Sequence, residues 1–175
     1  MTESFFSINK KVCVVTGGAG VLCNAICRFL AKVGAKVAVL DLRLKSAEII
    51  AAEIRAAGGE SIAVACNVLD KDSIQIAAQV VVERFGRVDI LINGAGGNKP
   101  EATTNPEQSF FDLPAESVRW VLDLNLMGTI LPSQVFSKIM ADQKSGVILN
   151  ISSMNAFRPL TRIPAYSAAK AGVHN

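Results

Sequence analysis

Histidine is almost absent from this chain, and the residues that usually bind metals are few. His174 is the only histidine, and there are four cysteines. Cys23 and Cys27 lie one helical turn apart, but a zinc site needs further cysteine or histidine ligands at set spacings, and the chain has none. The sequence therefore predicts no metal site. Free, buried cysteines fit a reducing cytosol, so we expect a cytoplasmic protein.

Long apolar segments and runs of one charge are also missing. No apolar stretch approaches the length that crosses a membrane, and residues 1–10 lack the apolar core and cleavage site of a signal peptide. The net charge is only +3, and no basic stretch carries interleaved aromatic residues. We therefore expect neither a membrane nor a nucleic acid as a partner.

What the chain does have is an alternation of two patterns, in a composition that is 50% hydrophobic and 19% charged. Short β-branched runs predict strands at residues 11–15, 36–40, 61–66, 88–93 and 146–151. Apolar residues at helical spacing predict helices at 21–33, 45–57, 70–85, 113–143 with an interruption near Asn125, and from 164 onward. Such alternation predicts an α/β fold with a doubly wound parallel sheet, whose ligands bind beyond the carboxyl ends of the strands.

A glycine-rich turn at residues 17–20 joins the first expected strand to the first expected helix. Gly18 and Gly20 fit a G-x-G-x-x-G pattern, whose third position holds Cys23. Glycines let the backbone approach a pyrophosphate, which then lies at the positive end of the helix. Cysteine is small, so we expect it to be accommodated with a slightly displaced helix. A tight turn that binds nothing is the alternative.

Asp41 ends the second expected strand. A carboxylate at this place can accept hydrogen bonds from both hydroxyls of an adenosine ribose, and it would repel a 2′-phosphate. We therefore expect NAD rather than NADP as cofactor. Arg43 could instead hold a phosphate if its side chain turned inward, and a simple turn residue is the other alternative for Asp41.

Tyr166 and Lys170 stand at positions i and i+4 of the last expected helix, and Ser153 precedes them after the fifth strand. On one helix face, the ammonium group can lie near the phenol and favour its ionised form, as a general acid/base requires. A surface tyrosine and lysine are the alternative for an isolated pair. The glycine turn and Asp41 fit the same function, which favours the catalytic interpretation.

Taken together, these motifs resemble the short-chain dehydrogenase/reductase family over the whole chain and in the family's order. Residues 16–23 match the cofactor loop, with Val21 and Cys23 where two glycines are usual. Residues 93–96 (Asn-Gly-Ala-Gly) match its Asn-Asn-Ala-Gly motif, with Gly94 in place of the second asparagine. Residues 67–68 stand where the family usually has Asp-Val against the adenine.

This resemblance implies hydride transfer between a nicotinamide and a CH–OH group. Asn125, Ser153, Tyr166 and Lys170 match the catalytic tetrad. In the implied mechanism, Asn125 holds a relay water and Ser153 positions the reacting oxygen. Tyr166 transfers the proton, and Lys170 assists the tyrosine and binds the nicotinamide ribose. The implied cofactor-binding residues are Gly17, Gly18, Ala19, Gly20, Val21, Leu22, Asp41, Leu42, Asn67, Val68, Asn93, Gly94, Ala95, Tyr166 and Lys170.

Segments 96–104, 110–113, 152–156 and 159–164 look like the branch of D-mannonate oxidoreductases (fructuronate reductases), which act on sugar acids. The carboxylate of such a small-molecule substrate calls for a cation or several donors. The candidates are Asn98, Lys99, Arg158 and Arg162, with ordinary solvated side chains as the alternative. Residues 94–114 are too long for an ordinary connection and predict a functional loop over the substrate, or else a mobile insertion.

The last residue, Asn175, comes soon after Lys170, whereas members of this family continue with further strands and a subunit interface. We expect residues 1–175 to be a single NAD(P)-binding Rossmann-type domain, incomplete at its C-terminus and truncated after an exposed fifth strand. A homo-oligomer, either tetramer or dimer, is expected of the full-length protein. The alternatives are a related reductase of another ketone, of gluconate or acyl-carrier type, and a non-catalytic dinucleotide-binding module.

Overall fold

A parallel five-stranded sheet forms the centre of the computed structural model, which describes residues 7–175. Its strands are β1 (Val12–Thr16), β2 (Lys36–Asp41), β3 (Glu60–Ala65), β4 (Ile90–Asn93) and β5 (Val147–Asn150). They are ordered β3-β2-β1-β4-β5, and every neighbouring pair is parallel. The predicted α/β fold with a doubly wound sheet is therefore confirmed. The expectation about a signal peptide falls mostly on residues 1–6, which lie outside the described residues.

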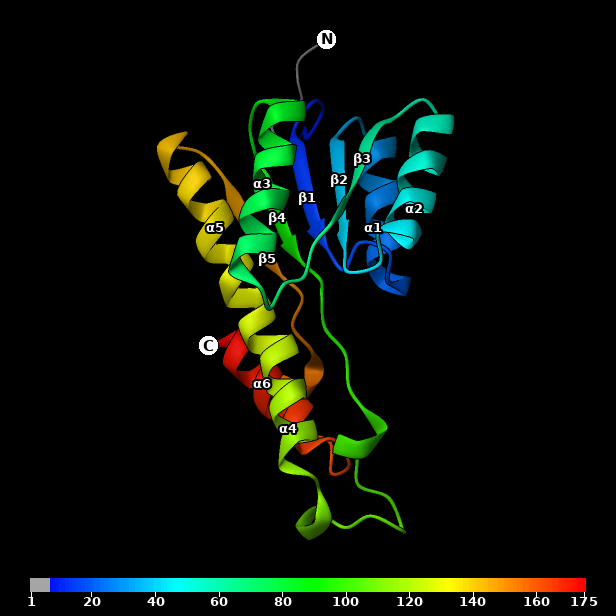
Figure 1. Ribbon diagram of the computed structural model, residues 1–175, viewed down its shortest axis with the longest axis vertical. Helices are drawn as coiled ribbons and strands as arrows, with labels where there is room; N and C mark the ends of the chain where they lie inside the picture. The colour runs from blue at the N-terminus through cyan, green and yellow to red at the C-terminus, as the bar shows by residue number, and fades with distance from the viewer. Residues whose placement is uncertain (1–6) are drawn as a thin grey trace.

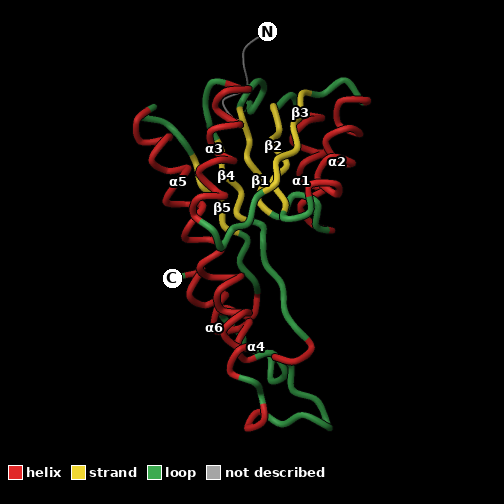
Figure 2. The backbone as a smooth tube through the Cα atoms, in the orientation of Figure 1, coloured by secondary structure: helices red, strands yellow, loops and turns green. Residues whose placement is uncertain are grey.

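Helices cover both faces of this sheet (Figure 1). Helices α1 (Val21–Lys32) and α2 (Leu44–Ala56) pack on one face, and α3 (Lys71–Phe85) and α5 (Gly128–Asp142) pack on the other. Helices α4 (Ala115–Leu122) and α6 (Pro164–His174) lie beyond the carboxyl ends of the strands, together with the long loop that precedes α4 (Figure 2). Within residues 7–175, no helix is both long and apolar enough to span a membrane.

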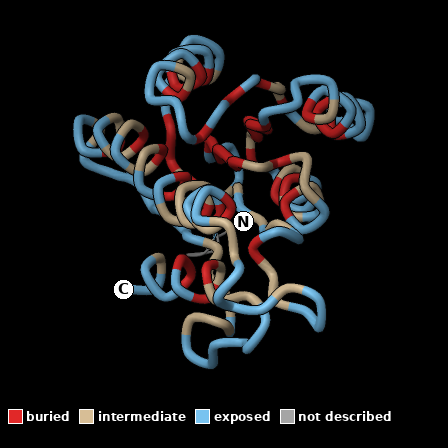
Figure 3. The backbone as a smooth tube through the Cα atoms, turned by 60° about the horizontal axis from the view of Figure 1, so that its bottom comes forward, coloured by how far each residue is buried: buried red, intermediate tan, exposed pale blue. Residues whose placement is uncertain are grey.

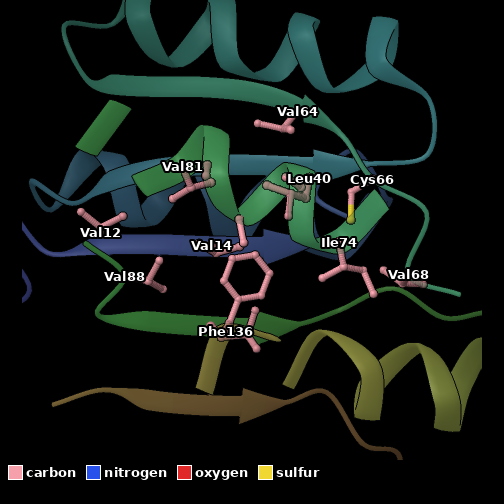
Figure 4. Close-up of a cluster of buried hydrophobic side chains, with 14 of the residues drawn as sticks. Val12, Val14, Leu40, Val64, Cys66, Val68, Ile74, Val81, Val88 and Phe136 are labelled. Carbon is pink, nitrogen blue, oxygen red and sulfur yellow. The ribbon is translucent and has the colours of Figure 1, made fainter. Parts of the chain in front are cut away.

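Two buried clusters lie on opposite faces of the sheet, because successive side chains of a strand point to opposite sides. Val14 packs with Phe136 in the cluster under α3 and α5, which Figure 4 shows. Val15 packs with Cys27 in the cluster under α1 and α2. Burial on both faces explains why the strands read as continuous apolar runs, and Figure 3 shows the buried segments at the centre of the fold.

Helix ends follow local chemistry. The Asp70 carboxylate accepts hydrogen bonds from the N–H groups of Asp72 and Ser73, and Gly86, with φ 82°, ends α3, which agrees with the helix predicted at 70–85. The helix expected from residue 113 begins later, because Pro114 adopts an extended conformation at its N-cap. The interruption expected near Asn125 takes the form of a π-helical turn, Asp123–Met127, between α4 and α5.

Strand β5 forms one edge of the sheet and is poorly covered. Val147, Ile148 and Leu149 are 60%, 36% and 50% exposed, although all three are apolar. Within residues 7–175, β5 pairs with β4 alone. The expected exposure of the fifth strand is therefore observed in the part of the chain that the structure describes.

Candidate active site

A cleft of about 690 Å³ lies at the carboxyl ends of the strands, where the chain leaves β1 toward β2 and later returns to the other side of β1 as β4. This crossover point is the usual ligand-binding place in a doubly wound sheet. The cleft is lined by Gly17, Gly20, Val21, Leu22, Cys23, Asp41, Leu42, Arg43, Cys66, Asn67, Val68, Gly94, Ala95, Gly96, Trp120 and Leu124.

Two turns of backbone meet at the floor of the cleft. The Thr16 hydroxyl accepts hydrogen bonds from the N–H groups of Gly94 (3.1 Å) and Ala95 (3.3 Å). Gly17 has a φ of 63°, and a methyl group added to it would lie only 2.8 Å from the Cα of Ala95. Glycine is therefore required at position 17 both by its backbone conformation and by the close approach of the segment after β4.

Helix α1 presents its positive end to the cleft. Its N-cap is Gly20, and no side chain within residues 7–175 caps it. Its first turn contains no acidic residue, and Gly20, Val21 and Leu22 line the cleft. Uncapped N–H groups at a helix start attract anions, so this end of the cleft can accept a phosphate or pyrophosphate group.

Asp41 supplies the acidic side chain of the cleft lining. Its carboxylate accepts hydrogen bonds from the N–H groups of Ala19 (3.1 Å) and Arg43 (3.0 Å), and the side chain is only 9% exposed. The Arg43 guanidinium lies 3.7 Å from the same carboxylate and is 70% exposed. Each carboxylate oxygen can accept further hydrogen bonds, so Asp41 remains able to receive hydroxyl groups from the cleft.

Three predicted cofactor residues lie behind the cleft lining. A methyl group at Gly18 would lie 2.7 Å from Cγ1 of Val39, so this glycine permits close packing against β2. The Ala19 N–H is bonded to Asp41, as described above. The buried Asn93 amide donates to the Ser133 hydroxyl (2.9 Å) and to the Asn150 side chain (2.8 Å), which ties β4 to α5 and β5.

Lys170 is a buried cation anchored to the end of β5. Its ammonium donates a 2.7 Å hydrogen bond to the carbonyl of Ile151 and lies 5.7 Å from the centroid of the Tyr166 ring. Burial lowers the pKa of the Lys170 ammonium, and the nearby Cys23 partly opposes this shift. The helical spacing therefore places this lysine and tyrosine beside each other.

Ser153 follows β5 and begins a short 3₁₀ turn, Met154–Ala156, that packs against α6. Its hydroxyl accepts a 3.2 Å hydrogen bond from the N–H of Asn155. The adjacent Ser152 hydroxyl donates to the Lys170 carbonyl at 3.4 Å. These contacts join the end of β5 to the helix that carries Tyr166.

Asn125 lies at the centre of the π-helical turn and is fully buried. Its side chain accepts from the N–H of Gly97 (3.1 Å) and donates to the carbonyls of Gly97 (2.7 Å) and Val121 (2.8 Å). A methyl group at Gly96 would lie 2.7 Å from Oδ1 of Asn125 and 3.6 Å from Nζ of Lys170. Two of the four predicted tetrad members therefore flank Gly96 at the edge of the cleft.

Internal hydrogen bonds order the long loop after β4. The Asn98 amide donates to the Thr103 hydroxyl at 2.8 Å, and the Thr104 N–H donates to the Arg162 carbonyl at 2.8 Å. The Lys99 ammonium lies 4.6 Å from the centroid of the Trp120 ring, a cation–π contact at the cleft lining. Of the four predicted substrate residues, Asn98, Arg158 and Arg162 are exposed, and none lines the cleft.

Six lining residues are absent from the predicted set of site residues: Cys23, Arg43, Cys66, Gly96, Trp120 and Leu124. The first two and Gly96 lie inside or beside the motifs that the sequence analysis describes, whereas the other three do not. Cys66 directly follows β3, so the rule that ligands gather past strand ends could have found it. Trp120 and Leu124 lie one turn apart, but their spacing fits a core-facing stripe equally well. Only the path of the loop and the π-helical turn reveal that they face the cleft.

Comparisons with known proteins agree with this geometry. A family model described as short chain dehydrogenase matches residues 11–175. The chain is 46% identical over 173 residues to the uncharacterized oxidoreductase UxuB of Bacillus subtilis, covering 94% of this chain and 62% of that protein. It is 37% identical over 168 residues to D-threitol dehydrogenase of Mycolicibacterium smegmatis, covering 96% and 62%.

Solved structures give the same relationship. A crystal structure of a candidate D-mannonate oxidoreductase from Haemophilus influenzae, with bound NAD, has a TM-score of 0.89 and 43% sequence identity, over 95% of this chain and 63% of that one. An NAD⁺-bound xylitol dehydrogenase has a TM-score of 0.88 and 30% identity, over 95% and 62%. The chain thus spans less than two thirds of the length of these relatives.

The clamp that Asn125 forms on Gly97 gives a first testable prediction. Replacing Asn125 with alanine leaves the Gly97 and Val121 backbone groups without partners, so we expect the free energy of unfolding to fall by about 1–3 kcal/mol. Urea denaturation measures the difference. Glu107→Ala, at an exposed position of the same loop where the hydrogen bond is made by the backbone N–H, serves as the control and should change it by less than about 0.5 kcal/mol. Equal losses for the two variants would contradict the clamp.

Proposed function

The chain belongs to the short-chain dehydrogenase family, and from that premise we propose that the protein binds NAD in the cleft and transfers a hydride between NAD(H) and a secondary alcohol or ketone. The observation that carries the proposal is the Lys170 ammonium, buried beside Tyr166 and next to Gly96, which lines the same cleft as Asp41 and the start of α1. The NAD bound to two structural relatives supports the same cofactor here.

The residues present fit a dinucleotide. The uncapped start of α1 suits a pyrophosphate, and the Asp41 carboxylate suits the two hydroxyls of the adenosine ribose. A 2′-phosphate would meet the Asp41 charge, which favours NAD over NADP. The ion pair of Arg43 with Asp41 supports this choice, because that guanidinium already faces the carboxylate. The bound nicotinamide supplies or accepts the hydride.

Tyr166 transfers the proton in this proposal. Its hydroxyl donates a proton to the carbonyl oxygen during reduction, and during oxidation its phenolate oxygen accepts the proton from the alcohol. The Lys170 charge stabilises the negative charge that develops on the phenol oxygen. One of its three N–H donors is bonded to the Ile151 carbonyl, and two remain for the nicotinamide ribose and a solvent molecule.

Ser153 and Asn125 complete the set. The Asn155 N–H occupies one acceptor site of the Ser153 hydroxyl, which leaves its proton free to bond the reacting oxygen and hold it in place. We assign to Asn125 the relay water that the family resemblance implies. The bonds from its side chain to Gly97 also hold the loop that borders the cleft.

The proposed substrate is a sugar acid such as D-mannonate or fructuronate. Similarity to the candidate D-mannonate oxidoreductase supports this class. Asn98 and Lys99 lie on one loop, Arg158 and Arg162 on another, and a hydrogen bond from Thr104 to the Arg162 carbonyl joins the two loops. These side chains are the proposed donors to the substrate carboxylate.

Location and assembly complete the proposal. The four cysteines are free and buried, which supports a cytoplasmic protein in a reducing compartment. We propose a homo-oligomer, either dimer or tetramer, on the family resemblance. The apolar, exposed side chains of β5 support further burial of this edge in the whole protein.

Replacing Tyr166 with phenylalanine removes the proton donor and keeps the ring. In the protein as the cell makes it, we expect kcat for NADH-dependent ketone reduction to fall by about 100-fold or more, with little change in NADH affinity. Stopped-flow absorbance and NADH fluorescence measure the two quantities. A variant that keeps most of the wild-type kcat would refute the assignment. NADH binding without turnover by the wild type would instead favour a non-catalytic dinucleotide-binding module.

The Asp41 carboxylate should decide between the two dinucleotides. We expect the wild type to bind NADH about tenfold or more tightly than NADPH, and Asp41→Asn to lose most of that preference because the repulsion of the 2′-phosphate is gone. Fluorescence titration with both cofactors measures the ratio. Asp72→Asn, at an exposed acid in the first turn of α3, is the control and should leave the ratio unchanged.

A substrate screen tests the sugar-acid assignment. We expect NADH oxidation with hexuronates or ketogluconates to exceed that with neutral ketoses, because only the acids offer a carboxylate to the two loops. Arg162→Gln should raise KM for the acids more than for the ketoses. Activity confined to steroids or acyl thioesters would exclude a sugar acid while leaving the proposed hydride transfer intact.

A further inference from the structure

Gly94 is a glycine for reasons of space, not of backbone conformation. The glycines with positive φ among the described residues are Gly17, Gly34, Gly58 and Gly86, so residue 94 has a conformation that other residues adopt. A methyl group added to Gly94 would overlap the Sγ atom of Cys23. The next atoms that it would meet are the Thr16 carbonyl oxygen at 3.0 Å and the Cβ of Cys23 at 3.7 Å. The sulfur is therefore the most severe obstacle, and the Thr16 carbonyl oxygen is a second, milder one.

Cys23 lies where α1 and the segment after β4 approach each other. It lies in the first turn of α1 and is only 3% exposed, and both Cys23 and Gly94 line the cleft. Its sulfur therefore lies between the two walls that would hold a pyrophosphate: the start of α1 and the segment after β4. A side chain at residue 94 could enter only if the Cys23 sulfur rotated into already packed space or one of these walls moved, because packed interiors have little spare volume.

Both residues are among the positions where the chain departs from the family pattern. Cys23 stands where the third glycine of the cofactor loop is usual, and Gly94 stands where the second asparagine of Asn-Asn-Ala-Gly is usual. In the structure, the Cys23 sulfur occupies the space that a side chain at residue 94 would need. The contact between Cys23 and Gly94 suggests that these two departures from the family pattern are linked.

We propose that Cys23 and Gly94 form one positioning unit, in which the Cys23 sulfur takes the place of a side chain at residue 94 and sets the spacing between the α1 start and the segment after β4 for the pyrophosphate of NAD. This inference rests on the proposed function. The burial that raises the pKa of the Cys23 thiol keeps it neutral, which suits a spacer in a cleft for an anionic ligand.

A double-mutant cycle tests the unit, with NADH affinity from fluorescence and the melting temperature as its two readouts. We expect Gly94→Ala alone to weaken NADH binding by about tenfold and to lower the melting temperature, since the new methyl group displaces one wall. In Cys23→Ala the nearest atom of residue 23 would be at an ordinary contact distance of 3.7 Å, which leaves the Thr16 carbonyl oxygen at 3.0 Å as the remaining close contact. The double variant should then bind NADH within about threefold of Cys23→Ala alone.

Two further variants separate this contact from general loss of packing. Cys27→Ala removes a buried thiol one turn along α1, whose sulfur contacts the Gly18 carbonyl and not residue 94. It should lower the melting temperature without restoring the NADH affinity that Gly94→Ala loses. Cys23→Ser keeps an atom at the γ position. Combined with Gly94→Ala, it should therefore restore less of the NADH affinity than Cys23→Ala does.

Additive effects in the Cys23 and Gly94 cycle would overturn the inference. If Gly94→Ala fails to fold and the double variant folds, the unit is supported; if neither folds, residue 94 needs glycine whatever stands at 23, and the inference is wrong. A wild type that does not bind NADH defeats the proposed function. In that case the melting temperatures alone still decide whether the two residues are coupled.

Discussion

The site depends on one constraint: the backbone turns after β1 and β4 meet so closely that a side chain at Gly17 or Gly94 would clash with the opposite segment or with Cys23. The Thr16 hydroxyl fastens the two turns by accepting from Gly94 and Ala95, and Gly17 lies against Ala95. The position of α1 relative to β4 follows from this junction, and with it the shape of the cleft. The apolar clusters on both sheet faces hold the strands in the register that the junction needs.

A second set of contacts lies beside Gly96 at the edge of the cleft, where a cation is buried. The Lys170 ammonium bonds the Ile151 carbonyl just past β5, and the Ser152 hydroxyl bonds the Lys170 carbonyl, so strand and helix hold each other in both directions. Asn125 holds the Gly97 backbone in the same neighbourhood. The hydrogen bond from the ammonium to Ile151 offsets part of the cost of burying the charge and also fixes the helix that carries Tyr166.

The sequence predicts those features that depend on local chemistry. Strands buried on both faces, the Asp70 cap and the Gly86 stop are all readable from residue type, and so is the gathering of glycine turn, Asp41 and Lys170 at one sheet edge. It predicts poorly what depends on distant packing. The cleft-facing side of Trp120 depends on the path of a loop far along the chain, and the role of Gly18 behind the lining depends on Val39 of a neighbouring strand. Spacing alone cannot distinguish these from ordinary core positions.

The π-helical turn at Asp123–Met127 has a consequence for how the gene can change. Such a turn holds one residue more than an α-helical turn, and each residue advances a helix by about 100°. The surplus residue lets α4 present Trp120 to the cleft while α5 presents Phe136 to the sheet. Chain length through this stretch is therefore under stricter constraint than residue identity: losing a single codon would rotate one helix out of phase with the other, whereas substitutions on their outer faces would preserve the phase.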